Sequence, residues 1–521
     1  NVVGDFFGND KPVALIIWTT TPWTLPANEA VSLHPDLDYA LVDVGKTFYI
    51  LSEDLLESSL ERYGIKDFKK LSRTYKGSEL EGIMLQHPFY DKQVPVILGD
   101  HVTTETGTGA VHTAPAHGQD DYVVGLQYNL PVDCPVDGRG VFIDSTEGVA
   151  GEFIFKANAT IMELLETQGT LVKHEPITHS YPHCWRHKTP VIFRATPQWF
   201  VSMTQKNLRD KVNDEILNVK WIPDWGQKRI EPMVGNRPDW CISRQRYWGS
   251  PITLFINKNT GELHPDTENL FEVVAKKIEL DGIEAWFKLQ VEDVLGSEAK
   301  DYEKTTDTLD VWFDSGVSHY AVLKASNYLS DVADMYLEGS DQHRGWFQSS
   351  LLTSCAINER APYKQVLTHG FTVDQNGHKM SKSLGNVIPP QKVVNSLGAD
   401  ILRLWIGSTD YSGEMTVSDE ILNRSADSYR RIRNTMRFML ANMQGFDPKN
   451  DLVDMNNMLV LDRWIVSKTH DLQQQVINEY DNYNFHFVMK AILNFCTNDL
   501  GGFYLDVIKD RQYTTQADSL A

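Results

Sequence analysis

The sequence predicts an α/β protein, because three stretches of the chain differ in the spacing of their apolar residues. In residues 1–175, short apolar runs such as Val13 to Trp18 are separated by Gly, Asp and Pro, which is typical of a β-rich mixed domain. In residues 176–415, strand-like runs such as Gln365 to Leu367 alternate with helical patterns, which favours a parallel sheet covered by helices. Residues 416–521 have apolar residues at helical spacing and predict a helical bundle.

Several elements are expected within these domains. Residues 54–63 have a helical pattern, and residues 255–305 are polar and charged enough to be an insertion. Further strand-like runs are expected at residues 94–98, 191–193 and 308–313. One helix of the last domain has a basic side, formed by Arg430, Arg431, Arg433 and Arg437.

Length and composition limit the class of protein. A chain of 521 residues is long enough for about three or four domains. The net charge of -21 does not exclude nucleic acid, because binding depends on local basic patches. The 5 cysteines include no Cys-x-x-Cys pair, which favours a reducing, cytoplasmic compartment, and no apolar run reaches the ~20 residues of a membrane span. The chain begins without Met and stops soon after a helical pattern, so we expect both ends to be cuts.

The most informative segment runs from His369 to Asn386 and carries two lysines in a loop after a strand. Lys379 and Lys382 flank a serine, and Gly377 and Gly385 allow the loop to move. Two ammonium groups on a mobile loop suit a polyphosphate whose negative charge grows during a reaction. The alternative is a solvated surface loop, since short lysine patterns are often no more than that.

A second polar segment, Tyr336 to Phe347, lies where a strand is expected to end and a helix to begin. Ligands of open α/β sheets bind at that edge. Glu338 and Asp341 are able to accept hydrogen bonds from an ammonium group or from ribose hydroxyls, and Gly339 allows close approach by a nucleoside. The alternative is that Ser340 and Asp341 only cap the helix.

Two further segments, residues 239–249 and 310–316, are rich in aromatic and charged residues. On its own, Trp312 reads as a core residue. Arg244 and Arg246 either meet phosphate or pair within the protein, and the sequence leaves both readings open.

Hydroxyl and imidazole groups gather in the first domain. A run of three threonines ends an apolar strand, although such runs are also common among ordinary strand residues. These are Thr19, Thr20 and Thr21. Residues 107–122 form a glycine-rich turn with two His and two Asp, but no compact ligand set, so we assign no metal there. His183, Cys184 and His187 lack the paired cysteines of a zinc site, and we expect structural roles for them.

Together these segments resemble class I aminoacyl-tRNA synthetases and, within them, the isoleucyl branch of bacterial type. The resemblance covers essentially the whole chain, with long motifs in the family's order. Residues 379–383 (Lys-Met-Ser-Lys-Ser) resemble the second class I signature, whose second lysine, here Lys382, stabilises the pyrophosphate during activation. The implied fold is the second half of a Rossmann-type catalytic domain with an inserted β-rich editing domain, followed by a helical domain that binds tRNA.

The resemblance also implies the residues of the catalytic site. The aminoacyl-adenylate would be bound by Glu338, Gly339, Asp341, Gln342, Trp312, His369 and Gly370. Trp312 would then be a wall of the amino-acid pocket. Lys379 and Lys382 would be catalytic, with Lys382 binding ATP, which enters as its Mg²⁺ complex.

The threonine run and residues 107–122 resemble the editing domain of the isoleucyl, valyl and leucyl enzymes. The implied pocket consists of Thr19, Thr20, Thr21, Asn28, His112 and Asp121. In the family, the aspartate matching Asp121 anchors the α-ammonium of a mischarged amino acid, and Thr20 and Thr21 would be catalytic with it. A third threonine in place of the arginine of the valyl and leucyl enzymes favours the isoleucyl member. Valine lacks one methylene of isoleucine, and a binding pocket can discriminate against that absence by only about 1–3 kcal/mol, a magnitude known from synthetases of this branch. A second pocket that hydrolyses the wrong ester would make up for this limited selectivity.

The implied activity is ATP-dependent activation of isoleucine, transfer to tRNA(Ile) and hydrolysis of valyl-tRNA(Ile), by a cytoplasmic monomer without membrane contact. The first class I signature, His-x-Gly-His, is missing from the chain, so we expect the chain alone to activate isoleucine poorly. Zinc is expected only in the C-terminal tail of the family, which this chain lacks. Three alternatives stay open: a valyl or leucyl enzyme, a non-catalytic tRNA-binding paralogue, and a free-standing editing hydrolase.

Overall fold

The computed structural model describes residues 11–516 and 519. The chain divides into two compact units, Asn1–Pro197 and Gln198–Ala521, and each is described by itself. The unit boundary lies later in the chain than the predicted domain boundary at residue 175. The intervening segment is bound to the first unit, since the N–H of Ala195 donates to the carbonyl oxygen of Ala116 at 2.9 Å. The division into three domains itself stays a prediction.

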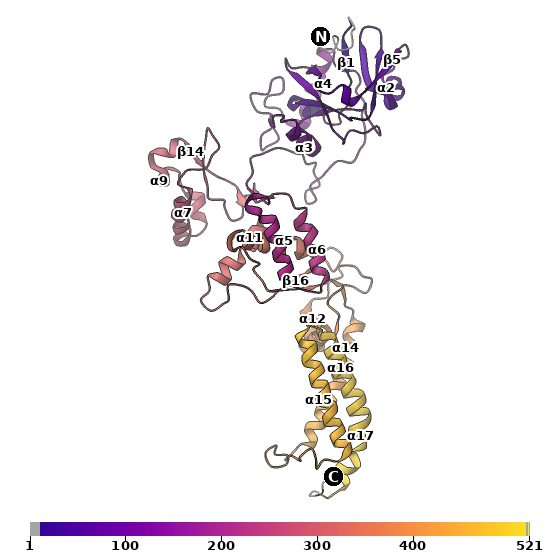
Figure 1. The fold of residues 1–521 in the computed structure, drawn as a ribbon, viewed down its shortest axis with the longest axis vertical. Helices are drawn as coiled ribbons and strands as arrows, with labels where there is room; N and C mark the ends of the chain where they lie inside the picture. Colours follow the sequence, from indigo (N-terminus) through magenta and orange to yellow (C-terminus); the bar gives the residue numbers. More distant parts are fainter. Residues whose placement is uncertain (1–10, 517–518, 520–521) are drawn as a thin grey trace. The chain divides into compact units, whose positions relative to one another are not determined.

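Two four-stranded sheets form the first unit, drawn in indigo and purple in Figure 1. The first has the order β1 (Val13–Leu15), β4 (Phe48–Ser52), β3 (Asp38–Asp43), β5 (Lys69–Lys76). The second has the order β6 (Met84–Gln86), β7 (Gln93–Leu98), β2 (Ala30–Leu33), β8 (Ala110–Thr113). A shared core that includes Val31, Leu33 and Leu41 joins them. The lysine-rich strand β5 is an exposed edge, where charge discourages pairing with another chain.

The helices of the first unit are short. They are η1 (Pro22–Ala27), η2 (Glu53–Leu55), α2 (Leu56–Tyr63), η3 (Gly77–Glu79), α3 (Gln119–Gln127) and α4 (Ile154–Thr167). The predicted helix at residues 54–63 corresponds to η2 and α2. The predicted strand from Val13 to Trp18 is shorter than expected, because the chain leaves the sheet after Leu15 and Trp18 makes only an isolated bridge to Val111. Helix α4 packs on η1 around Trp23.

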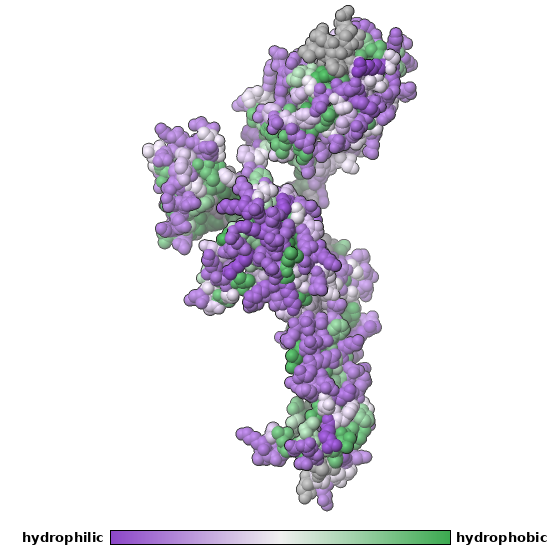
Figure 2. All heavy atoms as spheres, in the orientation of Figure 1, coloured by the Kyte–Doolittle hydropathy of each residue, from purple (hydrophilic) through white to green (hydrophobic). Residues whose placement is uncertain are grey.

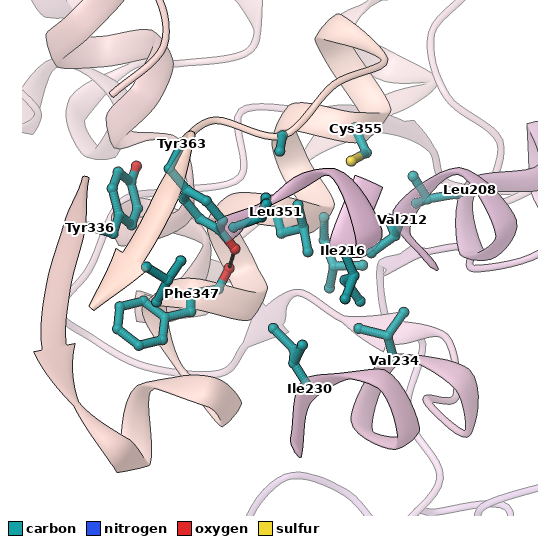
Figure 3. Packing of buried hydrophobic residues seen from close by; sticks show 14 of the residues in the cluster. Leu208, Val212, Ile216, Ile230, Val234, Tyr336, Phe347, Leu351, Cys355 and Tyr363 are labelled. Carbon is teal, nitrogen blue, oxygen red and sulfur yellow. Dashed lines mark hydrogen bonds between the residues drawn. The ribbon is translucent and has the colours of Figure 1, made fainter. Parts of the chain in front are cut away.

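The second unit contains a three-stranded parallel sheet of the order β10 (Lys220–Ile222), β17 (Gln365–His369), β16 (Tyr336–Gly339). Helices α5 (Leu208–Asn218), α6 (Trp225–Gly235) and α11 (Trp346–Asn358) accompany it. Figure 3 shows their apolar side chains meeting in one core, with Ile216 of α5, Ile230 of α6 and Leu351 of α11 all fully buried. These helices supply apolar residues three or four positions apart, as a face that packs requires.

The predicted insertion at residues 255–305 folds around its own small core. It comprises β13 (Phe255–Asn257), α7 (Thr267–Asp281), α8 (Glu284–Lys288), α9 (Glu292–Leu295), η5 (Gly296–Lys300) and β14 (Tyr302–Lys304). Phe255 and Trp286 stack edge to face at its centre with a ring-centroid distance of 5.5 Å. The polar segment is therefore folded, with a small core of its own.

Two strand predictions are wrong. Residues 308–313 form a strand only as far as Leu309 in β15 (Thr308–Leu309), because the Asp310 side chain accepts the N–H of Trp312 and caps a helix, α10 (Val311–Gly316). Residues 191–193 are no strand, since only single contacts such as Val191 N–H to Pro182 oxygen hold them.

Short elements and a long helical region complete the second unit. The short ones are β9 (Phe200–Val201), η4 (Gln205–Asn207), β11 (Trp240–Cys241), β12 (Ser243–Arg244), η6 (His319–Lys324), η7 (Ser340–Arg344), β18 (Thr372–Val373) and β19 (Met415–Thr416). The helical region comprises α12 (Pro390–Leu397), α13 (Ala399–Ser408), α14 (Asp419–Asn442), α15 (Val460–Asp481), α16 (Phe485–Asn494), η8 (Phe495–Tyr504), α17 (Leu505–Val507) and α18 (Lys509–Thr514). The face drawn in Figure 2 is largely hydrophilic.

Candidate active sites

The carboxyl ends of β16 and β17 meet at one edge of the parallel sheet. Gly339 at the end of β16 pairs in register with His369 at the end of β17. The Nε2 atom of His369 lies 3.8 Å from Oε1 of Glu338, and that oxygen accepts the N–H of Gly339 at 2.9 Å. The structure thus gathers three of the predicted binding residues where open α/β sheets bind ligands.

The two glycines at this edge have different surroundings. A Cβ atom on Gly339 would lie 2.9 Å from Oδ1 of Asp341, so the Asp341 carboxylate stands directly beside the strand end. A Cβ atom on Gly370 would lie 1.9 Å from the carbonyl oxygen of Gly413. The N–H of Gly370 also donates to the carbonyl oxygen of Tyr411 at 2.9 Å. Gly370 therefore fixes the end of β17 against the segment that precedes β19.

Gln342 and Trp312 adjoin at Gly345, where α11 begins. Oε1 of Gln342 accepts the N–H of Trp346 at 3.0 Å. A Cβ atom on Gly345 would lie 2.5 Å from that oxygen and 2.8 Å from the Trp312 ring. Trp312 is 41% exposed, so the core reading is wrong and part of this residue is accessible to solvent. The capping alternative for Ser340 and Asp341 is also wrong, because neither caps a helix and Gln342 takes that role.

The two arginines of residues 239–249 differ in their surroundings. Arg244 forms an ion pair with Asp310 at 2.8 Å, and the same carboxylate oxygen accepts the indole N–H of Trp240 at 3.1 Å. Arg244 is therefore an internal partner that holds the start of α10. Arg246 is exposed.

The two lysines of the loop also differ. The Nζ atom of Lys379 lies 3.7 Å from the centroid of the Phe371 ring, a cation–π contact. Lys382 is exposed and makes no hydrogen bond or ion pair with any residue between 11 and 516. Of the two ammonium groups, only that of Lys382 is uncommitted in this conformation.

In the first unit, the buried His112 on β8 organises the threonine run. Its Nε2 atom lies 2.9 Å from Oγ1 of Thr24, and its Nδ1 atom lies 3.4 Å from Nδ2 of Asn28. Because the Asn28 amide nitrogen is a donor, Nδ1 accepts and Nε2–H donates to Thr24, whose hydroxyl then donates to the Thr21 carbonyl at 2.8 Å. Burial lowers the pKa of His112 to about 4, so the ring is neutral at neutral pH.

The threonines form a turn rather than the end of a strand. The N–H of Thr21 donates to Oγ1 of Thr19 at 3.0 Å, and Pro22 opens η1 directly afterwards. Thr20 is half-buried and makes no hydrogen bond within the described chain. The strand alternative for these residues is therefore wrong, and Thr20 keeps a free hydroxyl. Thr24 is a residue that the sequence reading overlooked, although it lies three positions after Thr21 in the same run.

Asp121 lies in the first turn of α3 and folds back over the loop that carries it. Its Oδ2 atom accepts the N–H of Ala114 at 2.9 Å, and burial raises the pKa of this carboxyl group. Ala114 directly follows β8, so Asp121 and His112 are held by the same strand end. His117, the second histidine of the segment 107–122, anchors this loop through Nδ1, which lies 3.0 Å from the carbonyl oxygen of Phe193.

Residues 11–516 and 519 contain neither a metal-binding cluster nor a membrane-spanning helix. In that part of the chain no group of three or more His, Cys, Asp or Glu side chains is placed to hold a metal ion. The Sγ atom of Cys184 lies 3.5 Å from Nδ1 of His187, and the backbone N–H of His187 lowers the pKa of the thiol. No helix among the described residues has the length and apolar character needed to cross a membrane.

Comparison with known proteins identifies the family. Residues 28–418 match the family model described as tRNA synthetases class I (I, L, M and V), and residues 462–521 match the anticodon-binding domain of tRNA ligase. The first match covers most of the chain, so the chain belongs to the class I tRNA synthetases of this group, and the sheet with its glycine-bounded edge is part of their fold.

Individual relatives of the chain carry more specific names than the family does. The chain is 68% identical to isoleucine–tRNA ligase of Ruthia magnifica over 515 residues, which cover 99% of this chain and 56% of that protein. It is 61% identical to isoleucine–tRNA ligase of Shewanella sediminis over 513 residues, covering 98% and 54%. The chain therefore spans about half the length of the curated relatives it matches. A solved structure of Mycobacterium tuberculosis methionyl-tRNA synthetase in complex with methionyl-adenylate is 16% identical, covers 64% of this chain and 58% of that chain, and has a TM-score of 0.44.

Proposed function

We propose that the protein is an isoleucine-specific member of this family, which activates isoleucine with ATP and transfers it to tRNA(Ile). The observation that carries this proposal is the meeting of Glu338, Gly339 and His369 at the sheet edge, close in sequence to a loop with a free lysine. Identity of 60–68% to isoleucine–tRNA ligases over nearly the whole chain supports the choice of amino acid.

In this proposal the isoleucine carboxylate attacks the α-phosphorus of ATP, and pyrophosphate leaves as the Mg²⁺ complex. The Glu338 carboxylate is suited to accept from the substrate ammonium or ribose, and Gly339 leaves room for the nucleoside beside it. The exposed part of Trp312 is suited to offer an apolar wall to the side chain of the amino acid. The exposed ammonium of Lys382 is suited to meet the charge that develops on the leaving pyrophosphate.

ATP–pyrophosphate exchange tests this proposal. The assay uses the full gene product, since the relatives are about twice as long as this chain. We expect exchange with isoleucine to exceed that with valine by about 10- to 200-fold, the limit set by one methylene, and to be absent with leucine. Preference for valine or leucine would favour the alternative specificities, and no exchange with any amino acid would favour a non-catalytic tRNA-binding protein.

A second activity is proposed for the first unit: hydrolysis of valyl-tRNA(Ile). It rests on the relay from His112 through Thr24 to Thr21, on the free hydroxyl of Thr20, and on the carboxylate of Asp121 at the same strand end. A neutral, fully engaged imidazole holds the pocket in shape rather than shuttling protons. Asp121 is the group able to bind the α-ammonium of the ester, and the threonine hydroxyls are able to orient the attacking water.

Deacylation by this 521-residue chain tests the second activity. We expect loss of valine from valyl-tRNA(Ile) to be faster than loss of isoleucine from isoleucyl-tRNA(Ile). If neither is hydrolysed, an editing site that works without further segments is excluded, while the activation proposal stands.

The helical region is proposed to bind tRNA. The four arginines of α14 are exposed, which suits contact with phosphates. They are Arg430, Arg431, Arg433 and Arg437. The expectations of a monomer and of a cytoplasmic location stay predictions.

A further inference from the structure

The lysine loop is built on a tight turn at Asp374, directly after β18. Oδ1 of Asp374 accepts the backbone N–H groups of Asn376 at 2.9 Å and of His378 at 3.0 Å. The N–H of Asp374 donates to the carbonyl oxygen of His378 at 3.0 Å, and Gly377 has a φ of 79°. One carboxylate oxygen is therefore fully used in holding the turn.

The other carboxylate oxygen of Asp374 is bound by a residue on the far side of the loop. Nδ2 of Asn386 donates to Oδ2 of Asp374 at 2.9 Å and approaches the carbonyl oxygen of Lys379 at 3.4 Å. Oδ1 of Asn386 accepts the N–H of Ser381 at 2.9 Å. Both ends of the amide are thus occupied, one by the turn and one by the lysine-bearing backbone.

Between these two points the chain makes a small closed loop. The N–H of Gly385 donates to the carbonyl oxygen of Ser381 at 3.2 Å, and the N–H of Leu384 donates to Oγ of Ser381 at 3.2 Å. Met380 packs against the core around Trp405, which anchors one side of the loop. Lys382 lies at the exposed tip.

We propose that Asp374 and Asn386 form a clasp that positions Lys382 for the phosphates of the nucleoside triphosphate. They are positioning residues and touch no reacting atom. The inference rests on the proposed activation of isoleucine and adds to it two residues outside the Lys-Met-Ser-Lys-Ser string. A flexible loop would have to order itself around each substrate, whereas a clasped loop presents its lysine with less loss of entropy.

The chemistry of the clasp provides a sharp test, because its two polar groups are able to exchange places. In Asn386→Asp, two carboxylates would face each other across 2.9 Å. In Asp374→Asn, Oδ1 must still accept the two backbone N–H groups, so two amide NH₂ groups would face each other. The double variant combines both substitutions, so an amide again faces a carboxylate, with the direction of the hydrogen bond reversed. The new carboxylate at position 386 is still able to accept the N–H of Ser381.

The measurement is ATP–pyrophosphate exchange by the full gene product. We expect each single variant to lower kcat by about 10- to 100-fold with little change in the KM for isoleucine. The double variant should recover to within about threefold of the unaltered protein. In a Lys382→Ala background, Asn386→Asp should cost little more, because the clasp acts through that lysine. Asn269→Asp is the matched control, since Asn269 Nδ2 donates to Asp266 Oδ1 at 2.6 Å on the exposed insertion.

Three results would contradict the clasp. The first is full activity in both single variants. The second is a double variant that is as slow as the single variants although its unfolding midpoint equals that of the unaltered protein. The third is a loss of activity from Asn386→Asp that is just as large in the Lys382→Ala background. If Lys382→Ala lowers exchange while the clasp variants do not, the proposed function survives and this inference alone falls. If the unaltered protein shows no exchange, both fall together.

Discussion

The two candidate sites differ in the burial and pairing of their polar groups. In the first unit, His112 and Asn28 are buried; Nδ1 of His112 is paired with the Asn28 amide and Nε2 with the hydroxyl of Thr24. In the second unit, Lys382 lies on the loop after β18, where it is exposed and unpaired among the described residues. A pocket that must judge the size of an ester benefits from a fixed wall, and buried polar groups are tolerated there only when they are paired. A site that meets a polyphosphate is better served by a charge kept in water until its partner arrives, because an unpaired buried charge is costly.

The largest effect that this comparison predicts is the loss of the free charge. Lys382→Ala should lower ATP–pyrophosphate exchange by about 10²- to 10³-fold, the usual effect of removing one group that stabilises transition-state charge. Lys392→Ala is the matched control, because Lys392 is another exposed lysine and lies on α12. Equal losses in the two variants would show that general positive charge matters rather than this position, and the contrast between the sites would lose its basis.

The next prediction concerns the paired site. Asp121→Ala should slow deacylation of valyl-tRNA(Ile) by about 10²-fold, because the substrate ammonium loses its only proposed carboxylate partner and is no longer held in place. Asp120→Ala is the control, since Asp120 is the exposed neighbour on the same helical turn. Exchange with isoleucine should be unchanged in both variants. A loss of exchange in Asp121→Ala would mean that the two sites are not independent.

A smaller effect is expected from packing at the sheet edge. Gly370→Ala would bring its Cβ atom to 1.9 Å from the Gly413 carbonyl oxygen, so the backbone must shift, and we expect destabilisation of about 1–3 kcal/mol. Gly235→Ala, at the end of α6, meets nothing within 4 Å and should leave stability unchanged or slightly raised. Urea unfolding of both variants measures the difference. An unfolding curve of Gly370→Ala equal to that of the unaltered chain would contradict the tight contact.

The parallel sheet and the meeting of its strand ends were predictable, because strand and helix patterns alternate and parallel strands end at a common edge. Helix α10 was not predictable, because Asp310 ends the strand by capping this helix. A run of apolar residues does not reveal that one polar residue within it acts as a helix cap. The exposure of Trp312 was equally hidden, since composition makes tryptophan a core residue by default.

The candidate sites also contain features that the sequence identifies and features that it does not. The motif strings identified Glu338, Lys382 and Asp121 by residue type and resemblance, and their roles stay predictions. Contacts between residues far apart in the sequence could not be read from the strings. The pairing of Thr24 with His112 depends on how η1 meets β8, and the clasp depends on a loop that folds back over 12 positions. Only the folded chain brings such partners together.

The last prediction tests the burial of the first site through the pH dependence of stability. Burial lowers the pKa of His112 from 6.5 to about 4 and that of His87 likewise to about 4. Between these values the unfolded state binds a proton that the folded state excludes, so stability rises with pH and is lost as pH falls from about 6.5 towards 4. Each histidine should contribute a slope of about 1.4 kcal/mol per pH unit within that window.

Amide hydrogen exchange at β8 measures this slope as protection free energy after correction for the intrinsic exchange rate. His112→Gln should reduce the slope and leave the parts due to His87 and to His117, whose pKa burial also lowers. His174→Gln, at an exposed position, should leave the slope unchanged. A slope near zero in the unaltered chain would mean that solvent reaches His112. The first site would then not be buried, and the contrast with the exposed Lys382 would not hold.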